Sequence, residues 1–349
     1  MKRLGILLVT IALIVGMEGC IFGPSSQNLE IRTWYDLDDI RNNLSGHYIL
    51  MNDLDSTTAG YDELASPTAN EGEGWQPIIG AGGDPPFTGI FDGQGYEIRD
   101  LFINLPGKGY VGLFSVVGEE GRIGNIGVVN ADVTSTAYIG GLVGVNGGTV
   151  SNSYSTGSLT GVSVVGGLVG QNDGTVSNSY STGDVTSDSV AGGLMGGNTG
   201  TVSNSYSTGN LTCDSWVGGL TAVNSGTVSN SYSTSSVTGN DHVGGLMGAN
   251  SGTASNSYST GSVTGNDHVG GLVGYSEGTA GDSFWDTETS GQATSAGGTG
   301  KTTAEMQDST TFSGAAWNII AVANPGTRNL TYIWNIVNGV TYPFLSWES

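Results

Sequence analysis

A 26-residue tandem repeat constrains this chain more than any other feature of its sequence. The hexapeptide Ser-Asn-Ser-Tyr-Ser-Thr occurs five times, with its tyrosines at Tyr154, Tyr180, Tyr206, Tyr232 and Tyr258 and with Phe284 at the sixth position. The tripeptide Gly-Gly-Leu keeps the same step, with its leucines at Leu142, Leu168, Leu194, Leu220, Leu246 and Leu272. Because no insertion interrupts the phase, every unit must occupy the same structural slot as its neighbours.

Each unit is predicted to contain three short strands and three turns. The segment 175–181 alternates in polarity, which predicts a strand with Val176, Asn178 and Tyr180 on one face and the serines on the other. A second apolar stretch at 165–170 and a third around Val185 are separated by Gly, Asn, Asp and Ser, the residue types that form turns. One unit therefore reads as one coil of a solenoid.

A unit this small cannot bury its own apolar face, so the core must come from stacking equivalent side chains in columns. Val176, Val202 and Val228 are expected to form one internal column, and the repeat leucines another. A further internal column, with amides bonded from coil to coil, is expected from Asn178, Asn204, Asn230 and Asn256. A second asparagine column precedes the glycine of each turn, at Asn172, Asn198, Asn224 and Asn250.

The predicted fold is an all-β, right-handed parallel β-helix of about 26-residue coils with terminal caps. A β-propeller blade needs about 40–50 residues, and a helical repeat needs about 33 or more with few glycines. The sequence, with 61 glycines in 349 residues, fits neither. The right hand follows from the general handedness of parallel strand crossovers.

The predicted domain organisation has five parts. Residues 1–19 are expected to be a signal peptide, 20–30 a linker, 31–133 an N-terminal cap with the first irregular coils, 134–291 the tandem repeats, and 292–349 a short helix and cap. A short helix from Trp34 to Leu44 is expected to close one end of the solenoid. The segment from Phe312 to Trp347 is expected to cap the other end.

The N-terminus predicts export. Lys2 and Arg3 precede an apolar run that ends before Gly19-Cys20, and the run is shorter than the ~20 residues that span a bilayer. The signal resembles that of a bacterial lipoprotein, which implies acylation of Cys20 and a membrane anchor. Simple cleavage and an uncleaved anchor are the alternatives. Cys213 would then have no disulfide partner, and we expect it to be a buried or half-buried small side chain.

The charge balance excludes one class of partner. The formal net charge is −22, and no Lys or Arg occurs between Arg122 and Lys301. Nucleic-acid binding requires cationic side chains that neutralise phosphates, so no nucleic-acid partner is expected.

The repeats resemble the GLUG-motif proteins. The signature Gly-Leu-x-Gly stands at 167–170, 193–196, 245–248 and 271–274, whereas the unit at 219–222 departs from it with Thr221-Ala222. Segments 48–55, 87–95 and 283–291 also look like flanks found in that family. The resemblance implies a secreted or surface-attached, adhesin-like β-helix.

The same motif accompanies immunoglobulin A peptidases, but outside their zinc-protease domain. That domain needs His-Glu-x-x-His on a helix. The three histidines here, His47, His242 and His268, do not stand in such a motif. A protease function is therefore not expected.

Two motifs invite a ligand-binding interpretation. Gly300-Lys301-Thr302 lacks the first glycine of a phosphate-binding loop, because Ser295 stands there, and Thr302 with Glu305 fits a capping box better. Asp241-His242 and Asp267-His268 are one repeat apart and should stack, which makes them a weak candidate for a divalent-metal site. The same column carries Val164, Val190 and Trp216, which favours an exposed turn without metal. No cofactor or metal is expected.

The acidic and aromatic residues raise two further possible functions, catalysis and sugar binding. Glycosidases and polysaccharide lyases on β-helices need a carboxylate pair, yet candidates such as Asp184 with Asp188 fall in no recognisable motif. The tryptophans Trp216, Trp285, Trp317, Trp334 and Trp347 either stack on sugars or cap the solenoid.

The sequence thus predicts a non-enzymatic, adhesin-like protein of the cell envelope that presents an extended β-helix face to a surface, a matrix or a glycan. A carbohydrate-active β-helix enzyme and a passive structural spacer are the alternatives.

Overall fold

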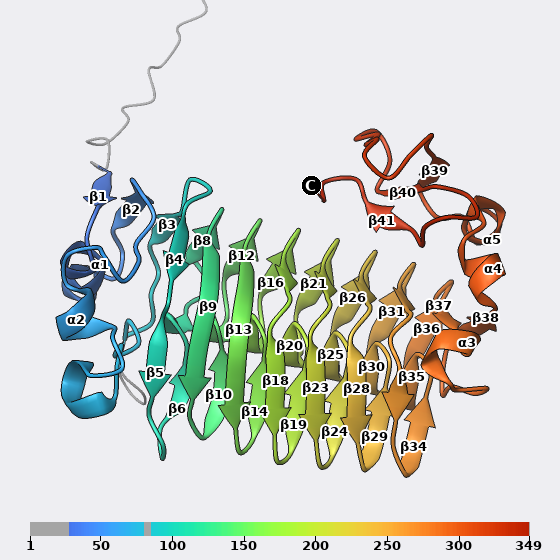
Figure 1. The fold of residues 1–349 in the computed structure, drawn as a ribbon, viewed down its shortest axis with the longest axis horizontal. Coiled ribbons are helices and arrows are strands. Elements are labelled where there is room, and N and C mark those ends of the chain that lie inside the picture. Colours follow the sequence, from blue (N-terminus) through green and yellow to red (C-terminus); the bar gives the residue numbers. More distant parts are fainter. Residues whose placement is uncertain (1–27, 80–84, 349) are drawn as a thin grey trace, which may run out of the picture.

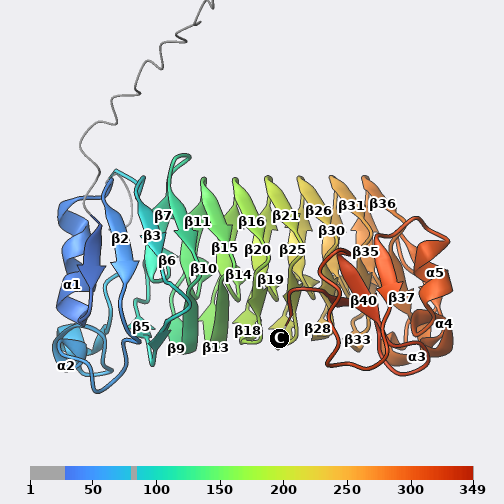
Figure 2. The ribbon, with the colours of Figure 1, turned by 90° about the horizontal axis from the view of Figure 1, so that it is seen from above.

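The computed structural model of the chain describes residues 28–79 and 85–348. The predicted signal peptide and Cys20 lie outside these residues. The described chain coils into an all-β parallel solenoid, with a short N-terminal helical cap and a C-terminal segment that folds back along one side (Figures 1 and 2). The prediction of a parallel β-helix with coils of about 26 residues is confirmed. The right hand of its coiling stays a prediction.

Four sheets run the length of the solenoid, and within each sheet the strands pair in parallel. The first sheet contains β1 (Leu29–Ile31), β2 (His47–Leu50), β3 (Ile90–Asp92), β8 (Arg122–Gly124), β12 (Thr149–Ser151), β16 (Thr175–Ser177), β21 (Thr201–Ser203), β26 (Thr227–Ser229), β31 (Thr253–Ser255) and β36 (Thr279–Gly281). The second contains β4 (Glu97–Arg99), β5 (Phe102–Asn104), β9 (Gly127–Thr134), β13 (Tyr154–Gly161), β17 (Tyr180–Ser181), β18 (Asp184–Ser187), β22 (Tyr206–Ser207), β23 (Asn210–Cys213), β27 (Tyr232–Ser233), β28 (Ser236–Gly239), β32 (Tyr258–Ser259), β33 (Val263–Thr264), β37 (Phe284–Asp286) and β38 (Thr299–Lys301).

The other two sheets complete the wall of the solenoid. The third contains β6 (Gly109–Val111), β10 (Ala137–Gly140), β14 (Val164–Gly166), β19 (Val190–Gly192), β24 (Trp216–Gly218), β29 (Asp241–Gly244) and β34 (Asp267–Gly270). The fourth contains β7 (Phe114–Val117), β11 (Val143–Asn146), β15 (Val169–Asn172), β20 (Met195–Asn198), β25 (Thr221–Asn224), β30 (Met247–Asn250) and β35 (Val273–Ser276). One coil, from β15 to β19, therefore holds five strands, so the expectation of three strands per coil is wrong. The coil turns more often because two residues between short strands, such as Asp173-Gly174 and Asn178-Ser179, suffice to change direction.

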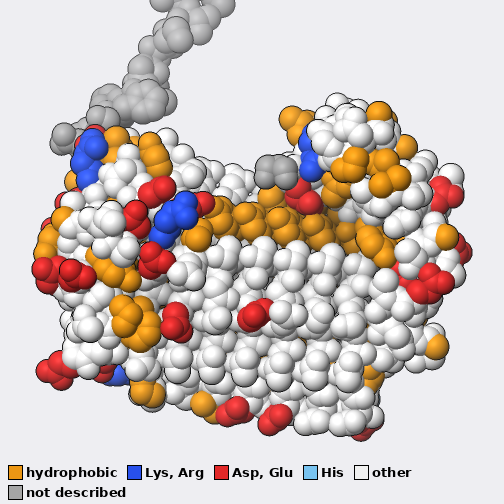
Figure 3. All heavy atoms as spheres, in the orientation of Figure 1, with side chains coloured by type: hydrophobic (Ala, Val, Ile, Leu, Met, Phe, Trp, Pro, Cys, Tyr) orange, Lys and Arg blue, Asp and Glu red, His pale blue; other side chains and the backbone are white. Residues whose placement is uncertain are grey.

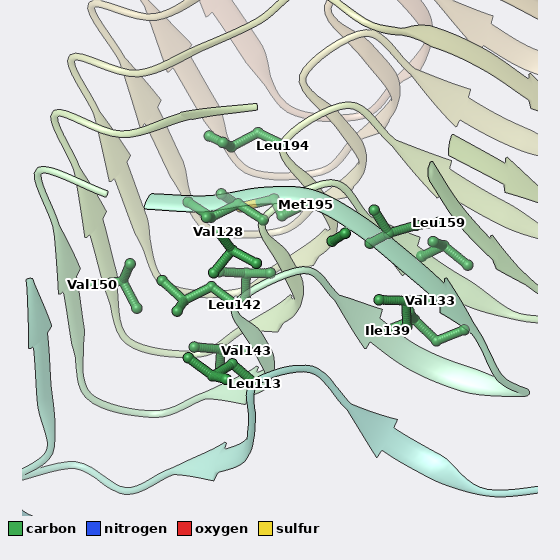
Figure 4. Close-up of a cluster of buried hydrophobic side chains, with 14 of the residues drawn as sticks. Leu113, Val128, Val133, Ile139, Leu142, Val143, Val150, Leu159, Leu194 and Met195 are labelled. Carbon is green, nitrogen blue, oxygen red and sulfur yellow. The ribbon is translucent and has the colours of Figure 1, made fainter. Parts of the chain in front are cut away.

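Within the tandem repeats the register steps by 26 residues from coil to coil, whereas the pairing of β9 with β13 shifts between Ser155 and Gly157. Thr175, Val176 and Ser177 pair with Thr201, Val202 and Ser203, and the same step of 26 continues along the repeats. The valine and leucine columns predicted from the repeat are buried throughout. Figure 4 shows part of this core, with Leu142 and Leu194 pointing into the same interior as Val150 and Leu159. Stacking of identical apolar residues therefore builds one continuous core.

The paired glycines of the repeat are required by close packing between coils. A Cβ on Gly193 would lie 2.0 Å from the carbonyl oxygen of Gly219 in the next coil. Backbone cannot yield at such a contact, so only glycine fits.

The N-terminal end is closed by short helices. α1 (Trp34–Asp38) opens with a capping box between Thr33 and Asp36 and continues into the 3-10 helix η1 (Asp39–Asn42). Trp34 is fully buried against Trp75, with α2 (Tyr61–Leu64) and the 3-10 helix η2 (Ala69–Gly72) beside it. The predicted short helix at this end is confirmed.

The C-terminal segment does more than close the other end. α3 (Thr287–Ser290), α4 (Thr303–Met306) and α5 (Ser309–Ser313) lie at the last coil, and the capping box predicted between Thr302 and Glu305 is present. A small sheet of β39 (Ile319–Ala321), β40 (Trp334–Ile336) and β41 (Phe344–Leu345) then turns back over the outside of the solenoid (Figure 1). Together with tyrosines of the repeats it encloses a second hydrophobic core.

Candidate functional site

The repeat tyrosines stack outside the solenoid wall, contrary to the prediction that they share a face with Val176. Asn178 adopts a left-handed backbone (φ 48°), and the same conformation recurs at Asn152, Asn204, Asn230 and Asn256. This residue reverses the strand alternation, so Ser179 and Ser181 turn inward and Tyr180 turns outward. Asn tolerates this conformation better than most residues, which is why it occupies the position.

We call the stacked rings of Tyr154, Tyr180, Tyr206, Tyr232 and Tyr258 the tyrosine ladder. Neighbouring ring centroids lie 4.8 to 5.0 Å apart, and neighbouring planes differ by 9° or less. The spacing is that of hydrogen-bonded strands, so the backbone register imposes the stacking. Figure 3 shows a continuous hydrophobic row at this place, in a hollow between the N-terminal elements and the C-terminal segment.

The C-terminal segment covers one end of the ladder. Tyr232 and Tyr258 are buried, and the ring of Trp334 lies 6.0 and 5.7 Å from theirs. The hydroxyl of Tyr258 donates a hydrogen bond to the carbonyl of Pro343. Burial raises the pKa of both phenols well above its usual value. This end of the ladder is therefore part of a hydrophobic core.

The other end of the ladder stays partly open. Tyr154 and Tyr180 are half-buried, and the hydroxyl of Tyr154 donates to the Glu97 carboxylate, which also pairs with Arg99. Burial, followed by this hydrogen bond, raises the pKa of Tyr154. The ring of Trp347 lies over the middle of the ladder, 6.4 Å from Tyr180 and 5.9 Å from Tyr206. The ladder thus accepts a planar group laid across it.

A hollow of about 270 Å³ opens beside Trp347 at the edge of the ladder. It is lined by Asn178, Asn204, Asn318, Leu330, Thr331, Tyr332, Ile333, Ser346 and Trp347. Two of these lining residues also carry a buried polar atom that makes no hydrogen bond, the indole Nε1 of Trp347 and the Oδ1 of Asn204. An unpaired donor and an unpaired acceptor are costly unless a polar ligand or water satisfies them.

The internal asparagine column is not the one predicted to be internal. The column that precedes the turns is the internal one: Asn172 and Asn198 are buried, and the amide nitrogen of Asn172 donates to Asn198 Oδ1 at 2.8 Å. The Asn178 column, expected inside, lies outside beside the ladder, and Asn178 donates to Asn152 Oδ1 across a partly exposed surface. The prediction of internal amide bonding is thus right in kind but was assigned to the wrong column.

The candidate metal ligands of the sequence lie together on another face of the solenoid. The structure brings Asp241, His242 and His268 into one group on β29 and β34, with ligand atoms within 4.8 Å of one another. Asp267 is more peripheral, because its carboxylate is 3.5 Å from His268 Nδ1 and its side chain is mostly exposed. Hydrogen bonding to Asp241 raises the pKa of His268.

Of the tryptophans predicted to be exposed or to cap the solenoid, only Trp216 is well exposed, at 39%. Trp285, Trp317 and Trp334 are buried, and Trp347 is half-buried. Trp216 belongs to the column of His242 and lies beside it, with ring centroids 5.4 Å apart. Cys213 is buried, as predicted, and burial raises the pKa of its thiol to about 11.

Within residues 28–79 and 85–348, no helix combines the length and the apolar character needed to cross a bilayer. 

Comparison with known proteins supports the repeat assignment. The sequence model of the GLUG motif matches residues 135–160 and 161–186, which confirms the resemblance at two adjacent coils. Halomucin of Haloquadratum walsbyi is 33% identical over 140 residues, which cover 39% of this chain and 2% of halomucin. A protein of Evansella cellulosilytica, provisionally named a Gly-rich membrane protein, is 36% identical over 129 residues, 35% of this chain and 14% of that protein.

One solved structure shares the fold over nearly the whole chain. It is a Bacteroides ovatus protein provisionally described as an immunoglobulin A1 protease, which matches with a TM-score of 0.58 and 23% identity over 94% of both chains. At this identity the match shows the fold alone.

Proposed function

We propose that this protein is a non-enzymatic, adhesin-like protein of the cell envelope that binds a glycan on the tyrosine ladder, between the hollow beside Trp347 and the open end at Tyr154. The hollow beside Trp347 carries the proposal, because it joins an aromatic surface to an unpaired donor on Trp347 and an unpaired acceptor on Asn204. A sugar ring offers an apolar C–H face for the aromatic side chains and hydroxyls that both donate and accept hydrogen bonds. Sites of this kind combine an apolar surface with a few placed polar groups.

The covered end of the ladder supports the proposal, because aromatic rings of the C-terminal segment already pack there as a ligand would pack at the open end. Trp334 and Trp347 of the C-terminal segment pack on the same column of tyrosines that continues, uncovered, toward Tyr154. The ladder surface is therefore one on which planar groups pack. An extended ligand could follow it from the hollow at Trp347 toward Tyr154 without a change in surface chemistry.

The charge of the repeats favours a neutral or cationic ligand. No Lys or Arg stands between Arg122 and Lys301, so nothing in the coils would neutralise an anionic polymer. Arg99, beside the open end of the ladder, is already paired with Glu97. A neutral glycan meets no electrostatic penalty on this surface.

The proposal of a non-enzymatic role is supported by the structural use of carboxylates at the last coil. Asp286 is fully buried, caps α3 through the backbone amides of Glu288 and Thr289, and accepts from the hydroxyl of Tyr342. A carboxylate held by this many partners is committed to packing rather than to acid–base chemistry.

The experiment is a glycan array, with hydrolysis or elimination of each bound glycan followed in the same wells. Trp347→Phe removes the Nε1 donor and keeps an aromatic ring, and Asn204→Gly removes the acceptor without straining the left-handed backbone. Each is expected to weaken binding about tenfold, the effect of about 1.4 kcal/mol.

Matched controls lie outside the hollow. Asn256→Gly changes the same repeat position at the covered end of the ladder, and Tyr138→Ala removes a half-buried ring that stacks on Tyr110 on a different sheet. Both should bind like the wild type. Product formation from any glycan would refute the non-enzymatic role, and absence of binding across the array would favour a passive spacer.

The envelope location is proposed on two grounds. One relative is a membrane protein by its provisional name, and the N-terminal sequence resembles a lipoprotein signal with Cys20 as the acylated residue. The mass of the N-terminal peptide of the native protein should exceed that of the unmodified peptide by the acyl groups, and Cys20→Ser should release the protein from membranes. An unmodified N-terminal peptide in membrane fractions would contradict the anchor.

A further inference from the structure

We propose that His242, His268 and Asp241 bind a divalent transition metal, such as Zn²⁺, between two neighbouring coils near the C-terminal end of the solenoid. This inference does not depend on the glycan site, which lies on another sheet. The donor set is two imidazole nitrogens and one carboxylate, the combination that suits zinc and its neighbours rather than Ca²⁺ or Mg²⁺.

The three side chains already converge on one point. His268 Nδ1 lies 2.8 Å from Asp241 Oδ1, and His242 Nδ1 lies 2.8 Å from Asp241 Oδ2. The two imidazole rings stack with centroids 4.5 Å apart and planes 22° apart, so both Nδ1 atoms reach the same carboxylate. Ligand atoms of a tetrahedral zinc ion are separated by about 3.3 Å, and the candidate atoms lie within 4.8 Å of one another, so they need to move by at most about 1.5 Å.

His242 Nδ1 provides an independent observation. This atom is buried and has no hydrogen-bond partner, because its approach to Asp241 lacks the angle of a hydrogen bond. The ring is held in place by packing against Trp216 on one side and Tyr275 on another. A buried nitrogen left without a partner is costly, and a metal ion would satisfy it.

The repeat itself shows that the fold does not require these histidines. The equivalent positions in earlier coils are Val164, Val190 and Trp216, and the backbone of the third sheet is continuous through all of them. His242 and His268 share the left-handed backbone of the equivalent Tyr138 (φ 51°, 46° and 51°) and are skipped in the ladder, where Asp241 pairs directly with Asp267. This shared conformation directs both imidazole rings to the same side of the sheet.

The local charge favours a cation. Asp241 and Asp267 flank the imidazoles, and no Lys or Arg stands in these coils to compete for the carboxylates. Asp267 Oδ2, 3.5 Å from His268 Nδ1, is the nearest further carboxylate oxygen, so it or a water molecule would complete the coordination. The metal would then add a further link between two coils that are already joined by strand pairing, packing and side-chain hydrogen bonds such as that from Asn266 to Asn240.

The test is a zinc titration of the full-length protein by calorimetry, together with the visible absorption of its Co²⁺ form. The wild type should take up one equivalent of Zn²⁺ and show the intense absorption bands of tetrahedral Co²⁺. The double variant His242→Asn/His268→Asn removes both imidazoles and keeps a residue type that adopts the left-handed backbone, so it should fold, and it should bind zinc about 100-fold more weakly or worse. Asp241→Asn should weaken binding while keeping the size of the side chain.

The matched control is Tyr138→Asn, which makes the same change at the equivalent left-handed position of an earlier coil without removing a ligand. It should keep zinc uptake and the cobalt spectrum. The proposal is overturned if the wild type shows no saturable zinc uptake, if the double variant binds zinc as the wild type does, or if Tyr138→Asn abolishes binding as fully as loss of both histidines. Glycan binding measured in parallel should be unaffected by the histidine variants.

Discussion

The two asparagine columns of this solenoid have the same residue type, the same 26-residue step and opposite environments. In the inner column, Asn198 is buried and bonded through its amide to the coils on both sides. In the outer column, Asn178 sits at a left-handed turn beside the tyrosine ladder, and its amide bonds a partly exposed neighbour. The comparison teaches that a repeated polar residue can serve either through its side-chain hydrogen bonds or through its backbone conformation. The tyrosine ladder likewise has one residue type in two environments, a covered end and an open end.

The largest difference in the free energy of unfolding is expected between variants at the two ends of the tyrosine ladder. Tyr258→Ala should lower the free energy of unfolding by about 4 kcal/mol, because it empties space in a core shared with Trp334 and Trp317. Tyr180→Ala, at the open end, should cost only about 1 to 2 kcal/mol, since its ring is already partly solvated. Urea unfolding measures both. Equal losses would show that the C-terminal segment does not make the covered end a core.

The stability of the covered end is also expected to depend on pH, through the carboxyl group of Glu348. Burial of Glu348 raises the pKa of its carboxyl to about 7, from 4.5. The folded state therefore holds a proton that the unfolded state releases, so the stability contributed by this group falls as pH rises from about 4.5 to about 7 and is constant above. The loss is at most about 3 kcal/mol.

Glu348→Gln is the matching variant, since it mimics the protonated carboxyl. Hydrogen exchange at Leu345, whose backbone amide donates to Glu348 Oε1, should quicken with pH across this window beyond the intrinsic rate in the wild type. The variant should lack that extra dependence. If both proteins respond alike, the carboxyl does not hold the C-terminal segment on the ladder.

The architecture follows from the sequence because a solenoid makes structural periodicity equal to sequence periodicity. One uninterrupted step of 26 fixes the parallel pairing of Val176 with Val202, the continuous core and the constant register of the tandem repeats. The same reasoning fails inside the coil, because a strand alternation with a period of two does not continue past Asn178. One left-handed residue reverses the faces, and nothing in the alternation of Ser and Tyr reveals it; the tendency of Asn toward that conformation was the available signal.

The sites were less predictable than the fold because they depend on which segments meet. The pairing of Asp241 with His242 and His268 could be anticipated, since one repeat separates the two motifs. The hollow at Asn204 could not, because it forms only where Trp347, far away in the sequence, folds back over the ladder. The C-terminal aromatics predicted a cap for the end of the solenoid, but not a cover along its side.

The inner asparagines are expected to matter more than the outer ones. Asn198→Ala removes the 2.8 Å acceptor of the Asn172 amide, which keeps only carbonyl oxygens at 3.3 Å, and leaves Asn224 Oδ1 without its donor, both within the wall. Unsatisfied buried groups of this kind should lower the free energy of unfolding by about 2 to 3 kcal/mol. Asn178→Ala, measured in the same urea titration, should cost about 1 kcal/mol. A smaller loss for Asn198 than for Asn178 would contradict the assignment of the inner column.

The smallest effect tests why the outer asparagines are there. If Asn178 is needed for its left-handed backbone, glycine should serve as well, because it adopts φ 48° without strain. Alanine should destabilise the protein, because its Cβ is strained in this conformation. The free energy of unfolding of Asn178→Gly should therefore lie within about 0.5 kcal/mol of the wild-type value and about 1 kcal/mol above that of Asn178→Ala. If glycine and alanine are equally destabilising, the bond from Asn178 to Asn152 supplies the stability, and the outer column is a true amide ladder like the inner one.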